Sequence, residues 1–228
     1  MISARDITKT YNAGKPNEFI AVRNVSLEID FHKLTILKGP SGSGKTTLLG
    51  MVGCMSRPTS GRMFLGEREI TSLPERFLTT IRRNTFGFIF QQFNLIKGMT
   101  VLDNVMIPAY PSNERFPALR KRALATLALF NLDHKAEAKI EWLSGGEAQR
   151  AAIARALINN PSVIIADEPT AHLDSGLSHE FMAIMRQLKE DGKTVILSSH
   201  DPIIFDSNLA DRVVEMHDGQ IVSTGLRS

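Results

Sequence analysis

The chain has 228 residues, of which 43% are hydrophobic and 22% are charged. These values are ordinary for a globular protein with a sizeable core, and they exclude a disordered tail and a disulfide-stabilised miniprotein. The net charge is only +3, and basic residues form no more than the short clusters Arg82–Arg83 and Arg120–Arg122. We expect both clusters to be solvated helix faces, and we expect no nucleic-acid partner.

A single cysteine, Cys54, cannot form an internal disulfide, which fits a reducing compartment such as the cytoplasm. The N-terminal residues show no secretion signal, and no stretch approaches the ~20 apolar residues that cross a bilayer. We therefore expect any role at a membrane to require a partner protein.

Strand-like and helix-like stretches alternate along the chain, which predicts an α/β fold. Residues 21–29 and part of 61–70 alternate with period two, as in a half-exposed antiparallel layer. Phe116–Leu132 and Ser175–Glu190 read as amphipathic helices. Residues 1–228 form one expected domain, with a helical subdomain at roughly 92–158. Buried parallel strands are expected in four β-branched and apolar runs, at Leu34–Leu37, Phe86–Phe90, Val163–Ala166 and Thr194–Leu197.

A glycine-rich loop follows the first of these runs and precedes a helix, in the order that a Walker A phosphate-binding loop requires. Its backbone N–H groups can surround a phosphate at the start of the helix. Lys45 can reach the β and γ phosphates, and the Thr46 hydroxyl is a suitable Mg²⁺ ligand. We predict ATP and Mg²⁺ as cofactors. The expected nucleotide-binding residues here are Gly39, Ser41, Gly42, Ser43, Gly44, Lys45, Thr46 and Thr47.

Two adjacent carboxylates, Asp167 and Glu168, end the apolar run at 163–166. On its own such a pair is more often a surface turn. In a chain with a Walker A loop, we expect Asp167 to hold Mg²⁺ with its waters, and Glu168 to orient or deprotonate the attacking water.

Leu143-Ser-Gly-Gly-Glu-Ala-Gln-Arg150 lies between these motifs, and together they resemble the signature set of ABC-type ATPases. The resemblance covers essentially the whole chain and implies a P-loop NTPase fold of ABC type. It implies that Gln91 contacts Mg²⁺ or the lytic water and that His200 senses the γ-phosphate. Tyr11 is similar to the aromatic residue that stacks on adenine, with ordinary packing as the alternative. Asp174 ends a segment similar to the D-loop.

Ser144 and Glu147 form a capping box, so simple helix initiation is one interpretation of the signature segment. Gly145 and Gly146 are poor helix formers that a cap does not need, and close approach of backbone N–H groups to an anion explains them. The resemblance implies that this anion is the γ-phosphate of an ATP bound to a second copy of the chain. We therefore expect an ATP-sandwich homodimer, and we expect His172 at its interface.

Four phenylalanines lie within eight positions around Gln91. We expect the alternating Phe86, Phe88 and Phe90 to be core residues. Phe93, Met99 and Met106 are expected to line a groove, because methionine adapts to partner surfaces. In relatives of this type, a coupling helix of an integral membrane permease docks in such a groove. A separate permease is therefore expected to dock near Gln91–Met106.

The string FGFIFQQFNLI and Glu147 directly after Ser-Gly-Gly resemble the macrolide-exporter and lipoprotein-releasing group of bacterial ABC ATPases. The resemblance implies an ATP-hydrolysing transporter subunit that drives lipoprotein, lipid or envelope export. It also implies a peripheral location on the cytoplasmic side of the bacterial inner membrane. A signalling permease complex, such as a cell-division regulator, shares every motif and remains the alternative.

Overall fold

The computed structural model describes residues 1–171 and 173–226. Its main sheet has six strands in the order β10-β9-β3-β8-β7-β6, and all neighbouring pairs are parallel except β9 and β10. The four predicted core strands are confirmed and occupy one side of this sheet. Their bounds, with those of the two remaining strands, are β3 (Leu34–Lys38), β6 (Phe86–Ile89), β7 (Val163–Asp167), β8 (Thr194–Ser199), β9 (Arg212–His217) and β10 (Gln220–Leu226).

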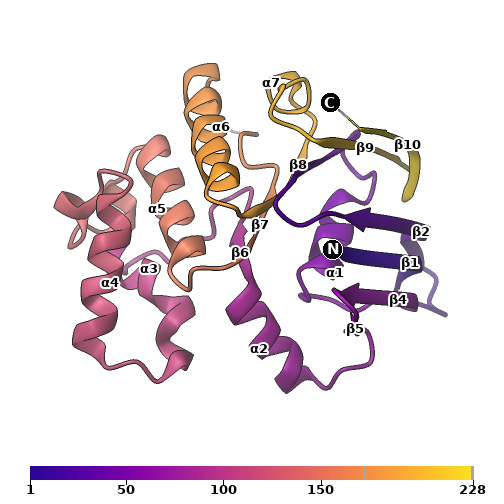
Figure 1. Cartoon of the computed structure of the whole chain (residues 1–228), viewed down its shortest axis with the longest axis horizontal. Coiled ribbons are helices and arrows are strands. Elements are labelled where there is room, and N and C mark those ends of the chain that lie inside the picture. The colour runs from indigo at the N-terminus through magenta and orange to yellow at the C-terminus, as the bar shows by residue number, and fades with distance from the viewer. Residues whose placement is uncertain (172, 227–228) are drawn as a thin grey trace.

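A second, antiparallel sheet lies beside the main one, in the order β2-β1-β4-β5 (Figure 1). Period-two alternation predicted β2 (Phe19–Ile29) and β4 (Ser60–Leu65), and both are present. In β2 the side chains alternate between buried and exposed from Val25 to Ile29, because one face of the sheet covers the core. The remaining strands of this layer are β1 (Ile2–Tyr11) and β5 (Arg68–Glu69).

All elements between β6 and β7 are helical, and they form a lobe beside the β6 edge of the main sheet (Figure 1). They are α3 (Val101–Met106), α4 (Phe116–Ala128), α5 (Gly145–Leu157) and the short 3-10 helices η1 (Ile107–Ser112), η2 (Asp133–Lys135) and η3 (Ile140–Trp142). Helix α4 ends four residues before the predicted end, because Asn131 adopts a left-handed conformation (φ 54°) and the chain turns into η2.

The remaining helices are α1 (Lys45–Val52), α2 (Glu75–Thr85), α6 (Ser175–Glu190) and α7 (Pro202–Phe205). Helix α6 has the bounds predicted from its periodicity. Helix α2 was not predicted, although Leu78 and Ile81 follow helical spacing and pack against the core. None of the helices in the described ranges combines the length and apolarity needed to cross a membrane.

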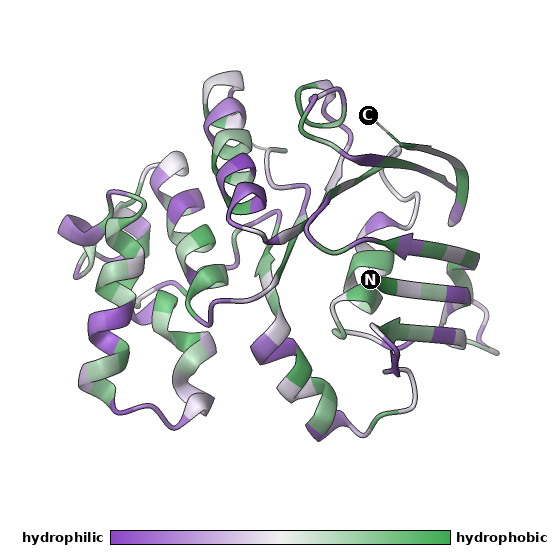
Figure 2. Cartoon of the chain, in the orientation of Figure 1, coloured by the Kyte–Doolittle hydropathy of each residue, from purple (hydrophilic) through white to green (hydrophobic). Residues whose placement is uncertain are grey.

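The main sheet separates two hydrophobic clusters, because successive strand residues point to opposite faces. In β7, Ile164 packs with the helical lobe and α6, whereas Val163 and Ile165 pack with α1 and the antiparallel layer. Hydrophobic residues accordingly fill the central strands in Figure 2. Burying each such side chain contributes about 1.5–3 kcal/mol, so both faces of the sheet hold the phosphate loop's strand in place.

Three arginines of the basic clusters form hydrogen bonds to carbonyl oxygens of other elements. Arg82 donates to the Cys54 carbonyl oxygen (2.6 Å) and Arg83 to the Pro111 carbonyl oxygen (2.7 Å), so α2 is tied to α1's end and to η1. Arg122 donates to the Ile158 carbonyl oxygen after α5. The expectation of solvated helix faces was wrong for these three arginines.

Cys54, the single cysteine, is buried, and burial raises the pKa of its thiol to about 11.

Candidate nucleotide site

The glycine-rich loop after β3 is held between two neighbouring strands, and this explains two of its glycines. Gly39 and Gly44 have φ values of 152° and 97°, which disfavour residues with a side chain. A Cβ at Gly39 would lie 2.2 Å from the Met216 carbonyl oxygen, and one at Gly44 would lie 2.4 Å from the Ala21 carbonyl oxygen. The loop therefore follows one path from β3 into α1.

Lys45, the first residue of α1, lies under this loop and is 5% exposed. Its Nζ donates to the carbonyl oxygens of Gly39 (2.7 Å) and Pro40 (3.0 Å), and lies 3.2 Å from Glu168 Oε1. A buried ammonium needs such partners, because desolvation of an unpaired charge is costly. The loop thus places a fixed positive charge at the base of the site.

Side-chain oxygen atoms from α1, β7 and β8 lie together at the carboxyl ends of β7 and β8. Thr46 Oγ1 donates to Asp167 Oδ1 (3.1 Å), and Ser198 Oγ donates to the same oxygen (2.6 Å). Ser198 also accepts from the Glu168 backbone N–H (3.0 Å). Sequence analysis missed Ser198, although its place opposite Asp167 in the β7–β8 register could have identified it.

These oxygen atoms are suitable ligands for Mg²⁺, which prefers hard oxygen ligands and keeps several of its waters. The Thr46 hydroxyl and the Asp167 carboxylate are already within hydrogen-bond distance of each other. Within the described part of the chain, no group of three or more His, Cys, Asp or Glu side chains is placed to hold a metal by itself. A cation here would share its coordination with waters and with a phosphate.

The backbone turns sharply at Glu168, directly after β7, where φ is 45°, a value uncommon for a residue with a side chain. Its Oε2 lies 2.8 Å from His200 Nδ1 and accepts from the His200 backbone N–H (3.3 Å). Its other oxygen faces Lys45. The carboxylate is therefore nearly buried and held between a lysine and a histidine, where it can take a proton from a water beside it.

A cavity of about 240 Å³ opens at this point. Ser43 Oγ is buried beside it and has no hydrogen-bond partner among the described residues, as expected of a group that awaits a ligand. Gln91, two residues after β6, also lines the cavity. Its lining residues are Phe19, Ala21, Ser41, Gly42, Ser43, Gly44, Lys45, Thr46, Thr47, Gln91, Glu168 and His200.

Tyr11 does not line this cavity, whereas its cross-strand partner Phe19 does. Both rings are exposed, and Lys9 Nζ lies 5.3 Å from the centre of the Tyr11 ring. Adenine stacking on Tyr11 thus stays a prediction, and Phe19 is a neighbouring aromatic residue that the sequence analysis did not consider.

The signature residues Ser144, Gly145 and Gly146 do not line the cavity, and Asp174 does not either. Ser144 and Glu147 form the predicted capping box at the start of α5. Hydrogen bonds from Lys135 and from the Ser144 N–H lower the pKa of Glu147 to about 2, so this carboxylate stays ionised at neutral pH. Asp174 caps α6 by accepting from the Leu177 N–H (2.9 Å). His172 lies outside the described residues.

The two signature glycines differ in their surroundings. A Cβ at Gly145 would meet no atom within 4 Å, so its surface is open. A Cβ at Gly146 would lie 2.7 Å from Leu177 Cδ2, because α6 packs against α5 at this point. Anion approach to both glycines stays a prediction, and at Gly146 an added Cβ would also require the Leu177 side chain to shift.

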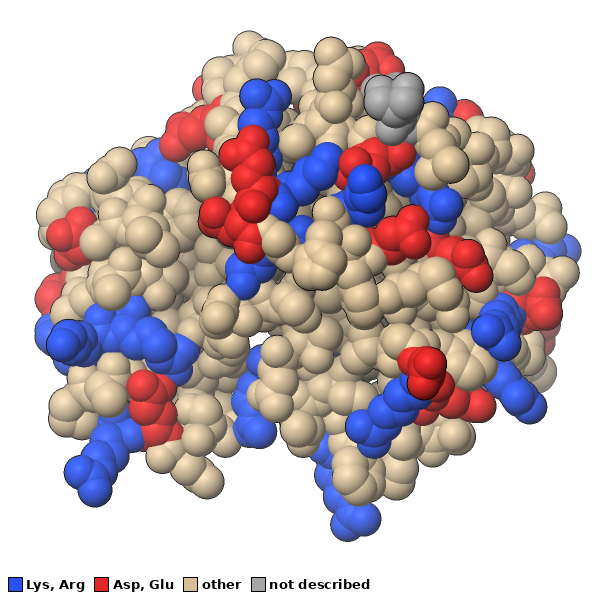
Figure 3. Space-filling model, viewed as in Figure 1, with Lys and Arg blue, Asp and Glu red and all other residues tan. Residues whose placement is uncertain are grey.

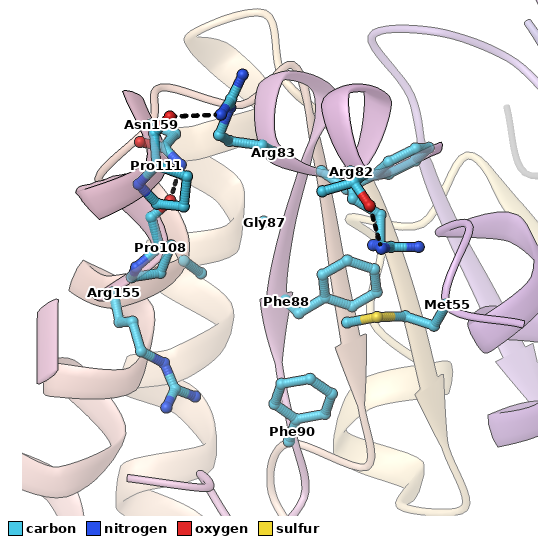
Figure 4. A pocket seen from close by; sticks show the side chains of 13 residues that line it. Met55, Arg82, Arg83, Gly87, Phe88, Phe90, Pro108, Pro111, Arg155 and Asn159 are labelled. Carbon is cyan, nitrogen blue, oxygen red and sulfur yellow. Dashed lines mark hydrogen bonds between the residues drawn. The ribbon is translucent and has the colours of Figure 1, made fainter. Parts of the chain in front are cut away.

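A second cavity, of about 280 Å³, lies between α2 and β6 on one side and η1 and α5 on the other. Phe88 and Phe90 line it with their rings stacked at 5.8 Å, opposite Pro108 and Pro111 (Figure 4). The complete lining is Met55, Thr79, Arg82, Arg83, Phe86, Gly87, Phe88, Phe90, Pro108, Pro111, Arg155, Ala156 and Asn159, and we call this cavity the apolar groove.

The predicted groove residues do not line this groove. Met106 is 1% exposed and belongs to the core, and neither Phe93 nor Met99 is among the lining residues. Phe93 instead has a left-handed φ of 57°, and its carbonyl oxygen accepts from Arg155 Nη2 (2.5 Å). Arg155 is nearly buried in α5, and burial lowers its pKa. This arginine, missed in the sequence analysis, ties the segment after Gln91 to the signature helix.

Comparison with known proteins identifies relatives whose names all describe ATP-binding transport or export proteins. The family model described as "ABC transporter" matches residues 22–171. An uncharacterized ABC transporter ATP-binding protein of Methanocaldococcus jannaschii, MJ0796, is 42% identical over 97% of this chain and 95% of its own length. A macrolide export ATP-binding/permease protein of Hyphomonas neptunium is 40% identical over 98% of this chain, which spans only 34% of that protein.

The fold is similar to a solved dimeric structure of MJ0796, with a TM-score of 0.90 and 39% identity over 100% of this chain and 99% of the other. A second structure of MJ0796, described as a dimeric post-hydrolysis state bound to ADP and Pi, matches equally well. The motifs, the fold and these relatives agree, and the chain therefore belongs to the ABC transporter family, as one of its ATP-hydrolysing cassettes.

Proposed function

We propose that this chain binds ATP and Mg²⁺ in the cavity around Lys45 and hydrolyses ATP as a dimer that drives a membrane permease. The observation that carries the proposal is that Lys45, Thr46 and the nearly buried Glu168 line one cavity, with Asp167 hydrogen-bonded to Thr46 beside it. MJ0796 supports it, since one of its structures is a dimer bound to ADP and Pi.

Each residue has a proposed part in this site. Lys45 and the loop N–H groups bind the β and γ phosphates, while Thr46 and Asp167, with Gln91, hold Mg²⁺. When bound, Mg²⁺ neutralises charge on the phosphate oxygens. Glu168 takes a proton from the attacking water, because its carboxylate is already oriented by Lys45 and His200.

The second copy is proposed because the signature residues lie outside the cavity of their own chain. Ser144 and Gly145 begin α5, where N–H groups not used within the helix favour an anion. A partner copy would place this helix start over the ATP held by the first copy. We further propose that Asp174 contacts the partner copy and that the Tyr11 ring stacks on adenine.

Replacing Lys45 with alanine should weaken ATP binding by about 10- to 100-fold, because one charged hydrogen-bonding partner of the phosphates is lost. Titration calorimetry with ATP and Mg²⁺ measures this dissociation constant. Lys121→Ala is the matched control, since Lys121 is exposed and outside the cavity. EDTA should stop ATP turnover of the unmodified chain. An unchanged dissociation constant in Lys45→Ala would contradict the proposal.

The apolar groove is the proposed docking site for a segment of the permease. It is concave and lined largely by Phe88, Phe90, Met55 and two prolines. The macrolide export relative supports a permease partner, because its name joins both functions in one chain. Lipoprotein, lipid or envelope export is the proposed purpose, and the cytoplasmic face of the inner membrane is the proposed location.

Replacing Phe88 with aspartate should abolish docking, because a charge would be desolvated in an apolar groove. The measurement is sedimentation of the purified chain with native membranes of the source cell, after a high-salt wash that removes loosely bound protein. Phe31→Asp is the control, since Phe31 is exposed and lies outside the groove. Equal membrane retention of both variants would exclude the groove as the docking site.

A further inference from the structure

Two copies of one tripeptide flank the apolar groove. Glu75-Arg76-Phe77 begins α2, and Glu114-Arg115-Phe116 leads into α4; we call them the ERF turns. Figure 1 places the first residues of both helices at the same lower edge of the molecule. The hydrogen bond from Arg83 to the Pro111 carbonyl oxygen joins the two sides of the groove between them.

Both ERF turns expose their phenylalanine to solvent. Phe77 is 40% exposed and Phe116 is 58% exposed. Every residue from 110 to 118 is exposed, which includes a second aromatic ring, Tyr110. Neither exposed phenylalanine lines the apolar groove, whereas Phe88 and Phe90 do. Both rings are therefore open to whatever lies against this edge, which Figure 3 shows as two projections.

Ion pairing leaves both ERF turns with a free positive charge. Glu75 lies 2.8 Å from Arg82 and 3.8 Å from Arg57, and Glu114 pairs with Arg122. In the described residues, neither Arg76 nor Arg115 has a carboxylate partner. Figure 3 accordingly shows Lys and Arg side chains at both lower projections, with a notch between them.

We propose that the two ERF turns bind the headgroup layer of an anionic phospholipid bilayer. An arginine beside an exposed aromatic ring suits this layer, because the ring enters the interface while the guanidinium meets phosphate. A protein partner fits the concave groove, whereas two separate projections fit a soft, flat surface. The proposal extends the proposed function, in which this edge faces a permease, but its test needs neither ATP nor a permease.

The first test measures sedimentation of the purified chain with protein-free vesicles of phosphatidylcholine, with or without phosphatidylglycerol. Binding should require phosphatidylglycerol and should disappear at high salt. The double variant Arg76→Gln/Arg115→Gln should bind about 25-fold more weakly, at about fivefold for each arginine. Arg23→Gln/Arg186→Gln removes the same charge from two exposed arginines on β2 and α6, and should bind like the unmodified chain.

The second test reports which part of the surface enters the bilayer. Trp142 is the only tryptophan, so Trp142→Phe gives a background in which a new tryptophan is the sole reporter. Phe116→Trp in this background should shift its emission to shorter wavelength with phosphatidylglycerol vesicles and be quenched by brominated lipid. Leu129→Trp is the control, because Leu129 is 76% exposed at the opposite end of α4, roughly 20 Å away at 1.5 Å per residue.

Three results would overturn the proposal. Failure of the unmodified chain to sediment with phosphatidylglycerol vesicles would assign the ERF turns to a protein partner. Equal loss of binding in both double variants would indicate general charge attraction. Quenching of the tryptophan at 129 and not at 116 would place the opposite end of α4 in the bilayer. None of these results bears on ATP hydrolysis, which is measured separately without vesicles.

Discussion

Replacing Glu168 with glutamine should leave ATP binding intact and lower turnover by about 10² to 10⁴, which corresponds to about 3 to 5 kcal/mol in the barrier. Glutamine keeps the shape of the side chain but cannot take a proton from water. The variant should therefore accumulate as an ATP-bound dimer. Single-turnover hydrolysis and size-exclusion chromatography with ATP and Mg²⁺ measure the two effects.

The same substitution should destabilise the ligand-free chain. Glu168 is the carboxylate partner of the nearly buried Lys45, and removal of one member of such a pair leaves an uncompensated charge. The two carbonyl oxygens that also accept from Lys45 reduce this cost. ATP should restore the stability of the variant, because its phosphates would take the place of the carboxylate. Thermal unfolding with and without ATP checks this reversal.

Glu190→Gln is a matched control, because it removes the same charge from an exposed position at the end of α6. It should change neither turnover nor the oligomeric state. Near-normal turnover in Glu168→Gln would assign proton transfer to another group. Loss of ATP binding would show that Glu168 is required to shape the site, and that Lys45 alone does not hold the phosphates.

Local patterns predicted the parts of the site that follow one another in the chain. The loop from Gly39 to Thr46 joins β3 to α1, and its function depends on backbone geometry that glycine spacing encodes directly. Buried parallel strands such as β7 are short apolar runs, so the ends that carry Asp167 and Glu168 could be located from the sequence.

Contacts between distant segments could not be predicted in this way. Arg155 is far in sequence from the Phe93 carbonyl oxygen that it holds, and nothing in its own helix indicates this partner. The groove residues were wrong for a similar reason. Alternation predicted Phe86, Phe88 and Phe90 as core residues, but Phe88 and Phe90 are only half-buried and line the apolar groove. Met106 is buried because α3 packs against α4 and α5.

Alanine substitutions at the two signature glycines should separate contacts between copies from contacts within one chain. Gly145→Ala should not destabilise the isolated chain, since the added Cβ meets no atom within 4 Å and alanine favours helix. If the Gly145 N–H binds a phosphate of the other copy, the added methyl group should lower turnover by on the order of 10², a cost typical of losing one preorganised donor.

Gly146→Ala should instead destabilise the isolated chain by about 1 kcal/mol, because the added Cβ would lie 2.7 Å from Leu177 Cδ2 and force that side chain out of its present rotamer. Urea unfolding of the two single variants measures the difference between them.

Leu177→Ala should rescue Gly146→Ala, because it removes the atoms that the new methyl group meets. The double-mutant cycle should give a favourable coupling of about 0.5–3 kcal/mol, the usual range for residues in contact. Leu177→Ala should not rescue the turnover of Gly145→Ala, whose defect would lie between copies. Zero coupling between Gly146 and Leu177 would mean that the leucine side chain adjusts freely, and anion approach alone would then explain both glycines.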